Sequence, residues 1–308
     1  MSPSRTAADT LLSRIEWTVI RRLDGLLQGD YRGLFRGIGI DLAGLRPYEP
    51  PDDVRSIDWN VTARLQEPHV RVYNEDREIT AWFLLDVSPS LDFGTSGRTK
   101  RQVAAELFAV LSRLLMRRGN RIGAIFFGGT DDRVIPAMGG RAHALSMLDL
   151  LLRQPALDRA PATSIRDAIE TASRVIRHRS VVFLISDFAS PVDWAHQLGA
   201  LAQRNEVISM RVVDPFEIEL PDAGILTIQD AETGERLQVD TGSRKLRDTF
   251  TALVAEQEAA MSAAMSTAGV DGLEVTTRDD LIDTILRFAH ARRLLAMTAG
   301  ATTPGRLP

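Results

Sequence analysis

Apolar runs of strand length alternate with helix-like stretches through the middle of this chain. The apolar runs cover residues 79–85, 121–127, 180–186 and 206–213. Between them, apolar residues recur three and four positions apart, which is the spacing of an amphipathic helix, at 100–118, 142–152 and 164–177. Strands that alternate with helices are joined by right-handed crossovers and form a mostly parallel sheet between two helical layers. The pattern therefore predicts an α/β fold with three layers.

The pattern changes after residue 213. Turn-forming residues surround two short strand-like runs, 225–229 and 236–239, and this arrangement predicts a hairpin appended to the sheet. A long helix, a short strand and a last helix are expected at 243–266, 272–276 and 279–295, respectively. Thr276 or Thr277 is the candidate cap of the last helix.

The chain divides into four parts. Residues 1–29 have apolar residues at helical spacing, but charged residues interrupt them, which indicates a packed amphipathic helix and no transmembrane segment. Residues 30–78 are rich in glycine, proline and charge, and should form short strands and turns. The main α/β domain is expected at 79–297, with the hairpin region at 215–240. The tail at 298–308 has no apolar period and is expected to be disordered.

Composition and charge narrow the class of protein. The chain has 308 residues, of which 44% are hydrophobic and 25% charged, as in an ordinary soluble globular protein. Its net charge of −4 provides no overall basic field for nucleic acid or an anionic membrane. The lack of cysteine excludes disulfides, thiolate metal sites and a cysteine nucleophile, and it agrees with a reducing compartment. We therefore expect a cytoplasmic protein that does not bind nucleic acid.

One carboxylate and two hydroxyls follow the first apolar run directly. Asp86, Ser88 and Ser90 stand at alternating positions where the strand at 79–85 should end. Hard oxygen ligands suit Mg²⁺ or Mn²⁺ better than Zn²⁺. The pattern alone is permissive, because serine and aspartate are common residues. Its position makes it informative, since ligands bind at the carboxyl ends of strands in open α/β sheets.

Two further oxygen-bearing residues are candidates for the same edge of the sheet. Asp187 follows the run at 180–186, so it should emerge beside Asp86. Thr163 precedes a predicted helix, in a loop that should lie over this edge, and Ser164 could substitute for it. Structural alternatives stay open, because Thr163 or Ser164 could cap the helix and Asp187 could serve in a turn.

Together these residues resemble the metal-ion-dependent adhesion site of von Willebrand factor type A domains, with their Asp-x-Ser-x-Ser, later threonine and later aspartate. The resemblance implies a Rossmann-like α/β sandwich, and a metal with one coordination position left open for an acidic residue of a partner. Ala162 departs from the pattern, because glycine often stands there. The ligands that the resemblance implies, direct or through water, are Asp86, Ser88, Ser90, Thr163 and Asp187.

Segments on both sides of this site resemble one particular bacterial family. Residues 45–59, 62–64 and 75–78 upstream, together with 213–221 downstream, look like the signature of the bacterial family called domain of unknown function 58, or DUF58. The similarity extends over roughly residues 32–293. Such proteins are typically encoded beside MoxR-type AAA+ ATPases. The resemblance therefore implies an adaptor or co-chaperone that works with such an ATPase on an unknown protein client.

The upstream block also has an interpretation from its residues alone. Asp52 and Asp53 can cap a short helix, and Arg55 can pair with Asp52 or Asp58. Trp59 can supply a large buried anchor. These features favour a structural role for the block over direct contact with a partner.

The best enzyme alternative is a phosphatase of the haloacid dehalogenase type, with Asp86 as its nucleophile. That chemistry usually requires a second aspartate two residues on, and a lysine in a later loop. Here the second position is Ser88, and neither Lys100 nor Lys245 falls in such a loop. No serine-hydrolase elbow, phosphate loop or zinc-protease motif is found, and the five histidines show no paired ligand spacing. We therefore expect a metal-dependent protein-interaction module and not an enzyme.

Overall fold

The computed structural model describes residues 42–50, 52–54, 57–73, 79–116, 119–155, 164–230 and 233–301. The amphipathic helix predicted at 1–29 lies outside these residues, as does the end of the predicted tail, 302–308. No helix in the described part of the chain is both long and apolar enough to span a membrane.

A six-stranded sheet forms the centre of the molecule. Its spatial order is β10, β7, β6, β3, β4 and β5, and every neighbouring pair is parallel except β4 with β5. The strands are β3 (Thr80–Asp86), β4 (Arg121–Phe127), β5 (Arg133–Met138), β6 (Val181–Ser186), β7 (Glu206–Val213) and β10 (Asp271–Thr276). The strand order reverses beside β3, as in doubly wound Rossmann-like sheets, so the crevice between β3 and β6 is the topological switch point.

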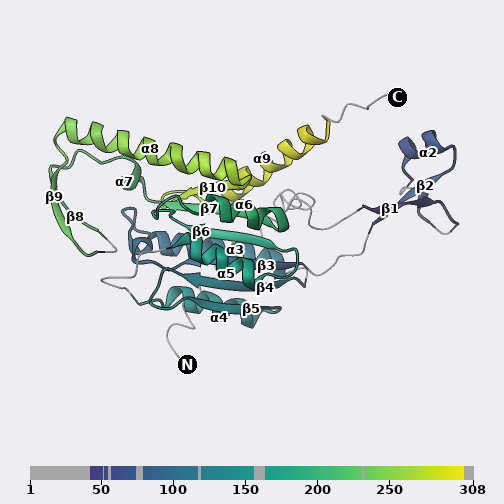
Figure 1. The fold of residues 1–308 in the computed structure, drawn as a ribbon, viewed down its shortest axis with the longest axis horizontal. Helices are drawn as coiled ribbons and strands as arrows, with labels where there is room; N and C mark the ends of the chain where they lie inside the picture. Colours follow the sequence, from purple (N-terminus) through teal and green to yellow (C-terminus); the bar gives the residue numbers. More distant parts are fainter. Residues whose placement is uncertain are drawn as a thin grey trace.

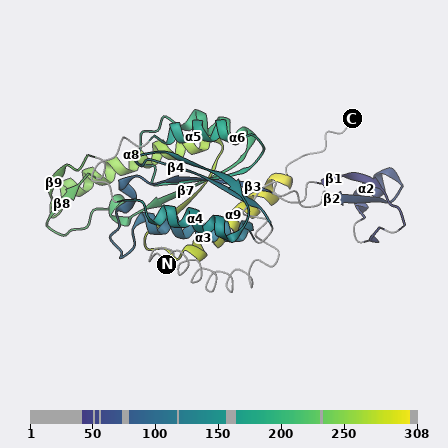
Figure 2. The ribbon, with the colours of Figure 1, turned by 90° about the horizontal axis from the view of Figure 1, so that it is seen from below.

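Helices cover both faces of this sheet (Figures 1 and 2). One face carries α3 (Lys100–Met116), α4 (Arg141–Leu152) and α9 (Leu281–Ala301). The other carries α5 (Ile165–Val175), α6 (Ala195–Arg204) and the carboxyl-terminal part of α8 (Arg244–Ala268). The predicted fold class is thus confirmed: a Rossmann-like three-layer α/β sandwich of the von Willebrand factor A type, with a mostly parallel sheet.

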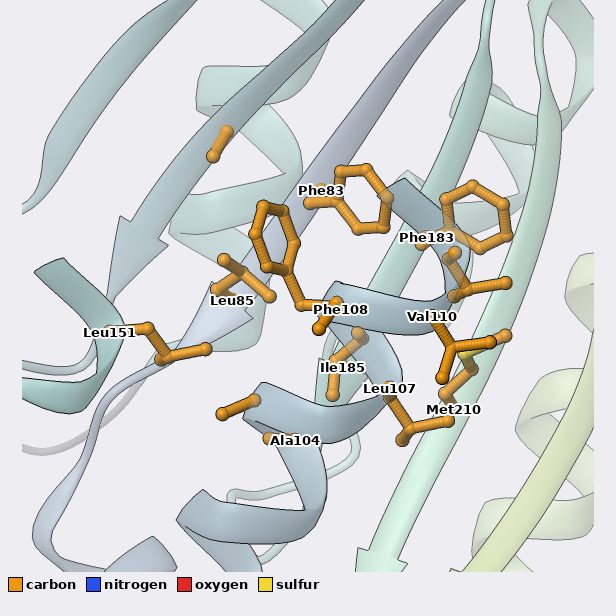
Figure 3. Close-up of a cluster of buried hydrophobic side chains, with 14 of the residues drawn as sticks. Phe83, Leu85, Ala104, Leu107, Phe108, Val110, Leu151, Phe183, Ile185 and Met210 are labelled. Atoms are coloured by element: carbon orange, nitrogen blue, oxygen red, sulfur yellow. The ribbon is translucent and has the colours of Figure 1, made fainter. Parts of the chain in front are cut away.

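The core fixes the direction of the site strand β3. Side chains alternate between the two faces of a strand, so Phe83 points towards α3 while Leu84 points to the opposite helical layer. Phe83 packs against Phe183 of β6, with ring centroids 5.0 Å apart, and against Phe108 of α3, at 4.8 Å (Figure 3). Because β3 is buried on both faces, the residue at its carboxyl end, Asp86, is held firmly in place.

The sequence pattern does not predict two elements of the three-layer sandwich, β5 and α6. β5 lies at the edge of the sheet, has largely exposed side chains and contains Pro136, which an edge strand tolerates. α6 is short and built mostly from small and polar residues, and only Leu198 and Leu201 are large apolar residues in it. One predicted boundary is wrong, because α9 continues to Ala301 and so includes residues 298–301 of the expected tail.

The predicted hairpin is present, but it does not extend the main sheet. β8 (Ile225–Gln229) and β9 (Arg236–Asp240) pair only with each other, as a separate antiparallel two-stranded sheet. A short helix that the sequence pattern missed, α7 (Pro215–Ile218), follows β7 directly and precedes the hairpin.

The upstream region forms a small lobe that stands apart from the main sheet (Figure 1). It contains the antiparallel strands β1 (Leu42–Pro47) and β2 (His69–Tyr73), with α2 (Trp59–Leu65) between them. The cap of α2 is Asp58, which accepts hydrogen bonds from two backbone amides of the helix, whereas Asp52 accepts two from the guanidinium of Arg46. The prediction of a buried Trp59 is wrong, because 69% of this residue is exposed. Arg55 lies outside the described residues.

Candidate metal centre

Asp86 is a buried carboxylate at the switch point of the sheet, with only 1% of the residue exposed. Its Oδ1 accepts a hydrogen bond from the backbone amide of Ser88 at 2.8 Å, and its Oδ2 accepts one from the hydroxyl of Ser186 at 2.6 Å. Burial and the negative charge of Asp187 raise the pKa of Asp86 to about 6. Burial has the larger effect on this pKa, and the neighbouring carboxylate adds to it.

The two predicted hydroxyls lie between the two carboxylates. The short 3₁₀ helix η3 (Pro89–Asp92) turns the chain directly after β3 and brings the Oγ atoms of Ser88 and Ser90 to 2.9 Å from each other. Ser90 also donates a hydrogen bond to the carboxylate of Asp187, which follows the neighbouring strand β6. The structure thus brings Asp86, Ser88, Ser90 and Asp187 together, as hard oxygen donors that fit Mg²⁺ or Mn²⁺.

That these residues bind a metal stays a prediction. Within the described ranges, no three histidine, aspartate or glutamate side chains converge as a cation site, so a metal here would depend on two carboxylates and on hydroxyls. Thr163 lies outside the described residues. Ser164, its possible substitute, caps α5 by accepting a hydrogen bond from the amide of Asp167 at 3.1 Å, which is the structural role that the sequence left open.

Lys100 also belongs to this cluster, although the sequence did not indicate it. Its ammonium lies 2.7 Å from Oδ2 of Asp187 and 2.6 Å from Oε1 of Glu217, and its side chain is only 1% exposed. Burial alone would raise the pKa of Asp187, but the Lys100 ammonium holds it below its usual range. Burial would likewise lower the pKa of Lys100, but its two carboxylate partners raise it, so the lysine stays charged.

Glu217 is held in place by the capping box of α7. The backbone amide of Asp214 donates to Oε2 of Glu217 at 2.9 Å, while Oδ1 of Asp214 accepts from the amide of Phe216 at 3.0 Å. One oxygen of Glu217 therefore caps the helix and the other faces Lys100. This contact gives a structural role to part of the segment at 213–221 that the sequence connected with DUF58.

Asp214 also joins three segments that are distant in the sequence. Besides capping α7, its carboxylate accepts hydrogen bonds from the amide and the hydroxyl of Thr95, at 2.8 and 2.6 Å, and from the hydroxyl of Thr277 at 2.6 Å. Thr95 lies in the loop before α3, and Thr277 lies in the turn after β10. These bonds fix the start of α3, from which Lys100 projects. They also hold the pKa of Asp214 below its usual range against the effect of burial.

Two further contacts hold the loops that carry the donors. Arg101 forms an ion pair with Asp92, and its guanidinium also lies close to the carbonyl oxygens of Val87 and Ser88, so it braces the loop after β3. After β6, Phe188 has a φ of 57°, which is unusual for an aromatic residue. Its amide donates to the hydroxyl of Ser186 at 3.0 Å.

A cavity of about 530 Å³ opens beside the cluster. It lies between the loop after β6, the short helix α7 and the middle of α8; the last two are neighbours (Figure 1). Its walls include Lys100, Asp187, Phe188, Glu217 and Met261. The Lys100 ion pair therefore borders an open space and is not sealed in packed core.

The geometry does not favour a phosphatase. The lysine that the sequence placed away from the site is close to it, but its ammonium bonds to Asp187 and not to the expected nucleophile, Asp86. Both oxygens of Asp86 already accept hydrogen bonds, and the position of the general acid is taken by Ser88.

Comparison with known proteins identifies the family to which this chain is similar. A family described as "Protein of unknown function DUF58" matches residues 44–260, which is more than half of this chain. The proteins Rv1480 of Mycobacterium tuberculosis H37Rv and Mb1516 of Mycobacterium bovis are each 38% identical over 284 residues, covering 92% of this chain and 89% of theirs.

Among solved structures, BatB of Bacteroides thetaiotaomicron is 16% identical, over 70% of this chain and 99% of its own, with a TM-score of 0.43. The von Willebrand factor A domain of SpRpn10 is 14% identical, over 68% and 94%, with a TM-score of 0.39. Likeness at this level supports no argument about function, and the fold assignment rests on the strand order of the sheet.

Proposed function

This chain belongs to the DUF58 family, and from that premise and the geometry of its sheet edge we propose that it is a metal-dependent protein-interaction module. The observation that supports the proposal is the pair of buried carboxylates, Asp86 and Asp187, with the hydroxyls of Ser88 and Ser90 between them. The pair lies at the topological switch point, where Rossmann-like sheets bind their ligands. The raised pKa of Asp86 marks a place where a cation would relieve unfavourable charge.

The metal is Mg²⁺ or Mn²⁺, held by Asp86, Ser88, Ser90 and Asp187, with Thr163 as the predicted fifth ligand. When bound, it supplies positive charge and an open coordination position for a carboxylate of a partner protein. The residues of the chain orient the donors: Ser186 and the amide of Ser88 fix the carboxylate of Asp86, and Arg101 braces the loop. Recognition would then depend on the metal and on an acidic residue of the partner.

The partners that we propose are a MoxR-type AAA+ ATPase and a protein client, with this chain as their adaptor or co-chaperone in the cytoplasm. Support for the ATPase comes from the family resemblance and not from the contacts described above. The neighbouring cavity, which Asp187 lines, offers a surface from which a partner side chain could approach the carboxylate cluster.

A metal titration tests the proposal. We expect saturating Mg²⁺ or Mn²⁺ to raise the melting temperature of the metal-free wild type by roughly 5–10 °C, because a ligand at a hundred times its Kd adds about 2.7 kcal/mol to the free energy of unfolding. Asp86→Ala should abolish the shift, because it removes a carboxylate donor.

The matched control is Asp222→Asn, which changes an exposed aspartate that pairs with Arg247 near the hairpin. This variant should show the full wild-type shift. A wild type that does not respond to either ion, or an equal response in Asp86→Ala, would overturn the proposed metal function.

A further inference from the structure

Lys100 and a metal would need the same carboxylate. The Lys100 ammonium takes Oδ2 of Asp187 at 2.7 Å, while Oδ1 of Asp187 accepts the backbone amide of Ala189 at 3.1 Å. Both oxygens of Asp187 therefore already have partners. A cation that bound between Asp86 and Asp187 would compete directly with the ammonium for the charge of Asp187.

The charges of the cluster do not balance. Asp86, Asp187 and Glu217 carry three negative charges when ionised, and Lys100 carries a single positive charge against them. Two units of negative charge remain, which is the charge that one divalent cation neutralises. The lysine thus compensates part of the charge of the site without removing its need for a metal.

The Lys100 ammonium also has a second carboxylate partner, Glu217. Glu217 is fixed by the amide of Asp214 on Oε2, so its Oε1 stays available 2.6 Å from Lys100. The cavity beside the cluster borders Lys100, Asp187 and Glu217, and the lysine stem is flexible. Lys100 can therefore leave Asp187 and remain paired with Glu217.

From these contacts we infer that Lys100 competes with the metal for Asp187. By holding or releasing this carboxylate, Lys100 lowers or raises the affinity of the site for the metal. The inference rests on the proposed metal function and deepens it. With Lys100 on Asp187, the site binds a divalent cation weakly. With Lys100 on Glu217 alone, Asp187 is free and the site binds the cation tightly, so metal binding and movement of the lysine are coupled.

Lys100→Met is the direct test, because it removes the ammonium and keeps most of the apolar stem. We expect its Kd for Mn²⁺, measured by calorimetry on the folded full chain, to be at least about tenfold lower than that of the wild type. The estimate follows from the one to three pKa units by which a neighbouring opposite charge shifts a carboxylate.

A second variant separates competition from overall charge, and also serves if Lys100→Met does not fold. Lys100→Met with Glu217→Gln removes one positive and one negative charge, so the net charge of the cluster is unchanged, and the oxygen of the new side-chain amide can still accept the backbone amide of Asp214. We expect this double variant to bind Mn²⁺ more tightly than the wild type as well. Glu217→Gln alone leaves Lys100 on Asp187 and should bind with equal or lower affinity.

The outcomes distinguish the inference from the proposed function. Wild-type affinity in both lysine variants would overturn the competition and leave the metal function standing. Tighter binding in Lys100→Met but wild-type affinity in the double variant would indicate a long-range charge effect, and would also overturn it. If no folded form binds Mn²⁺, the proposed metal function fails and the inference fails with it.

Discussion

Asp86 links the charge of the metal centre to the stability of the chain. In the folded protein its pKa is about 6, raised from 3.8 by burial and by Asp187. Between about pH 4 and 6 the folded chain therefore binds a proton that the unfolded chain has released, so the free energy of unfolding decreases as the pH rises through this window. For the metal-free protein we expect this group to contribute a loss of about 1 kcal/mol between pH 5 and pH 7.5.

Urea denaturation of the wild type and Asp86→Asn in EDTA would measure this contribution as the difference between the two pH profiles. The asparagine variant should lack the decrease, because it has no proton to release. Saturating Mg²⁺ should restore stability to the wild type at pH 7.5 and leave the variant unchanged. Parallel profiles for the two proteins would contradict the prediction.

At the scale of single residues, the sequence reveals donors that follow strands, but not contacts across the fold. Asp86, Ser88 and Ser90 are close in the chain, and Asp187 could be predicted because it ends a similar apolar run. Lys100 meets Asp187 across 87 positions and Glu217 across 117. The only hint was composition, because Lys100 is one of two lysines in an arginine-rich chain and begins an apolar helix.

At the scale of elements, Asp214 connects α7 with the loop before α3 and the turn after β10. We expect Asp214→Asn to lower the free energy of unfolding by about 3 kcal/mol, because an amide nitrogen would face donors that now bond to a buried carboxylate oxygen. Chemical denaturation at neutral pH would measure the loss. The start of α3 should loosen as well, so that Lys100 no longer holds its position.

The control for this prediction is Asp222→Asn, whose exposed ion pair with Arg247 should contribute no more than about 0.5 kcal/mol. Hydrogen exchange provides a second measurement: the amides of Thr95 and Phe216 should lose protection in the Asp214 variant only. Equal stability of the two variants would show that the connection through Asp214 does not hold the elements together.

Helices and strands that have a clear local pattern of apolar residues could be predicted from the sequence. Features that depend on contacts with residues distant in the chain could not. Strands β3, β4 and β6 are buried on both faces, so each is a nearly continuous apolar run, and β7 keeps most of such a run around Ser209 and Arg211. The edge strand β5 also has mostly apolar residues, but it contains Pro136 and its side chains are largely exposed, so its sequence gives no clear signal of a strand. Thr277, a candidate cap of α9, instead donates to Asp214, and Asp280 caps the helix by accepting two amides.

At the scale of the whole molecule, strand order creates the site. Chain order and sheet order differ, so that β6, which follows β4 and β5 in the chain, lies beside β3 and brings Asp187 to Asp86. The alternation of strands and helices predicted a parallel sheet, and with it a shared carboxyl edge. It did not predict the separate sheet of the hairpin or the exposed position of Trp59, because both depend on which surfaces meet.

The whole molecule is also the scale at which the proposed partner must be tested. If a carboxylate of the host's MoxR-type ATPase completes the metal shell, Asp86→Ala should raise the Kd of the complex at least about tenfold, because the partner's carboxylate loses the cation that it contacts. Magnesium and ATP should be held constant in a surface-binding measurement, since a chelator would also disable the ATPase. Asp222 pairs with Arg247 and not with a residue of the carboxylate cluster, so Asp222→Asn should retain wild-type affinity for the ATPase. Equal affinity of the wild type and Asp86→Ala would separate the ATPase from the metal site, and no binding in any form would exclude this ATPase as the partner.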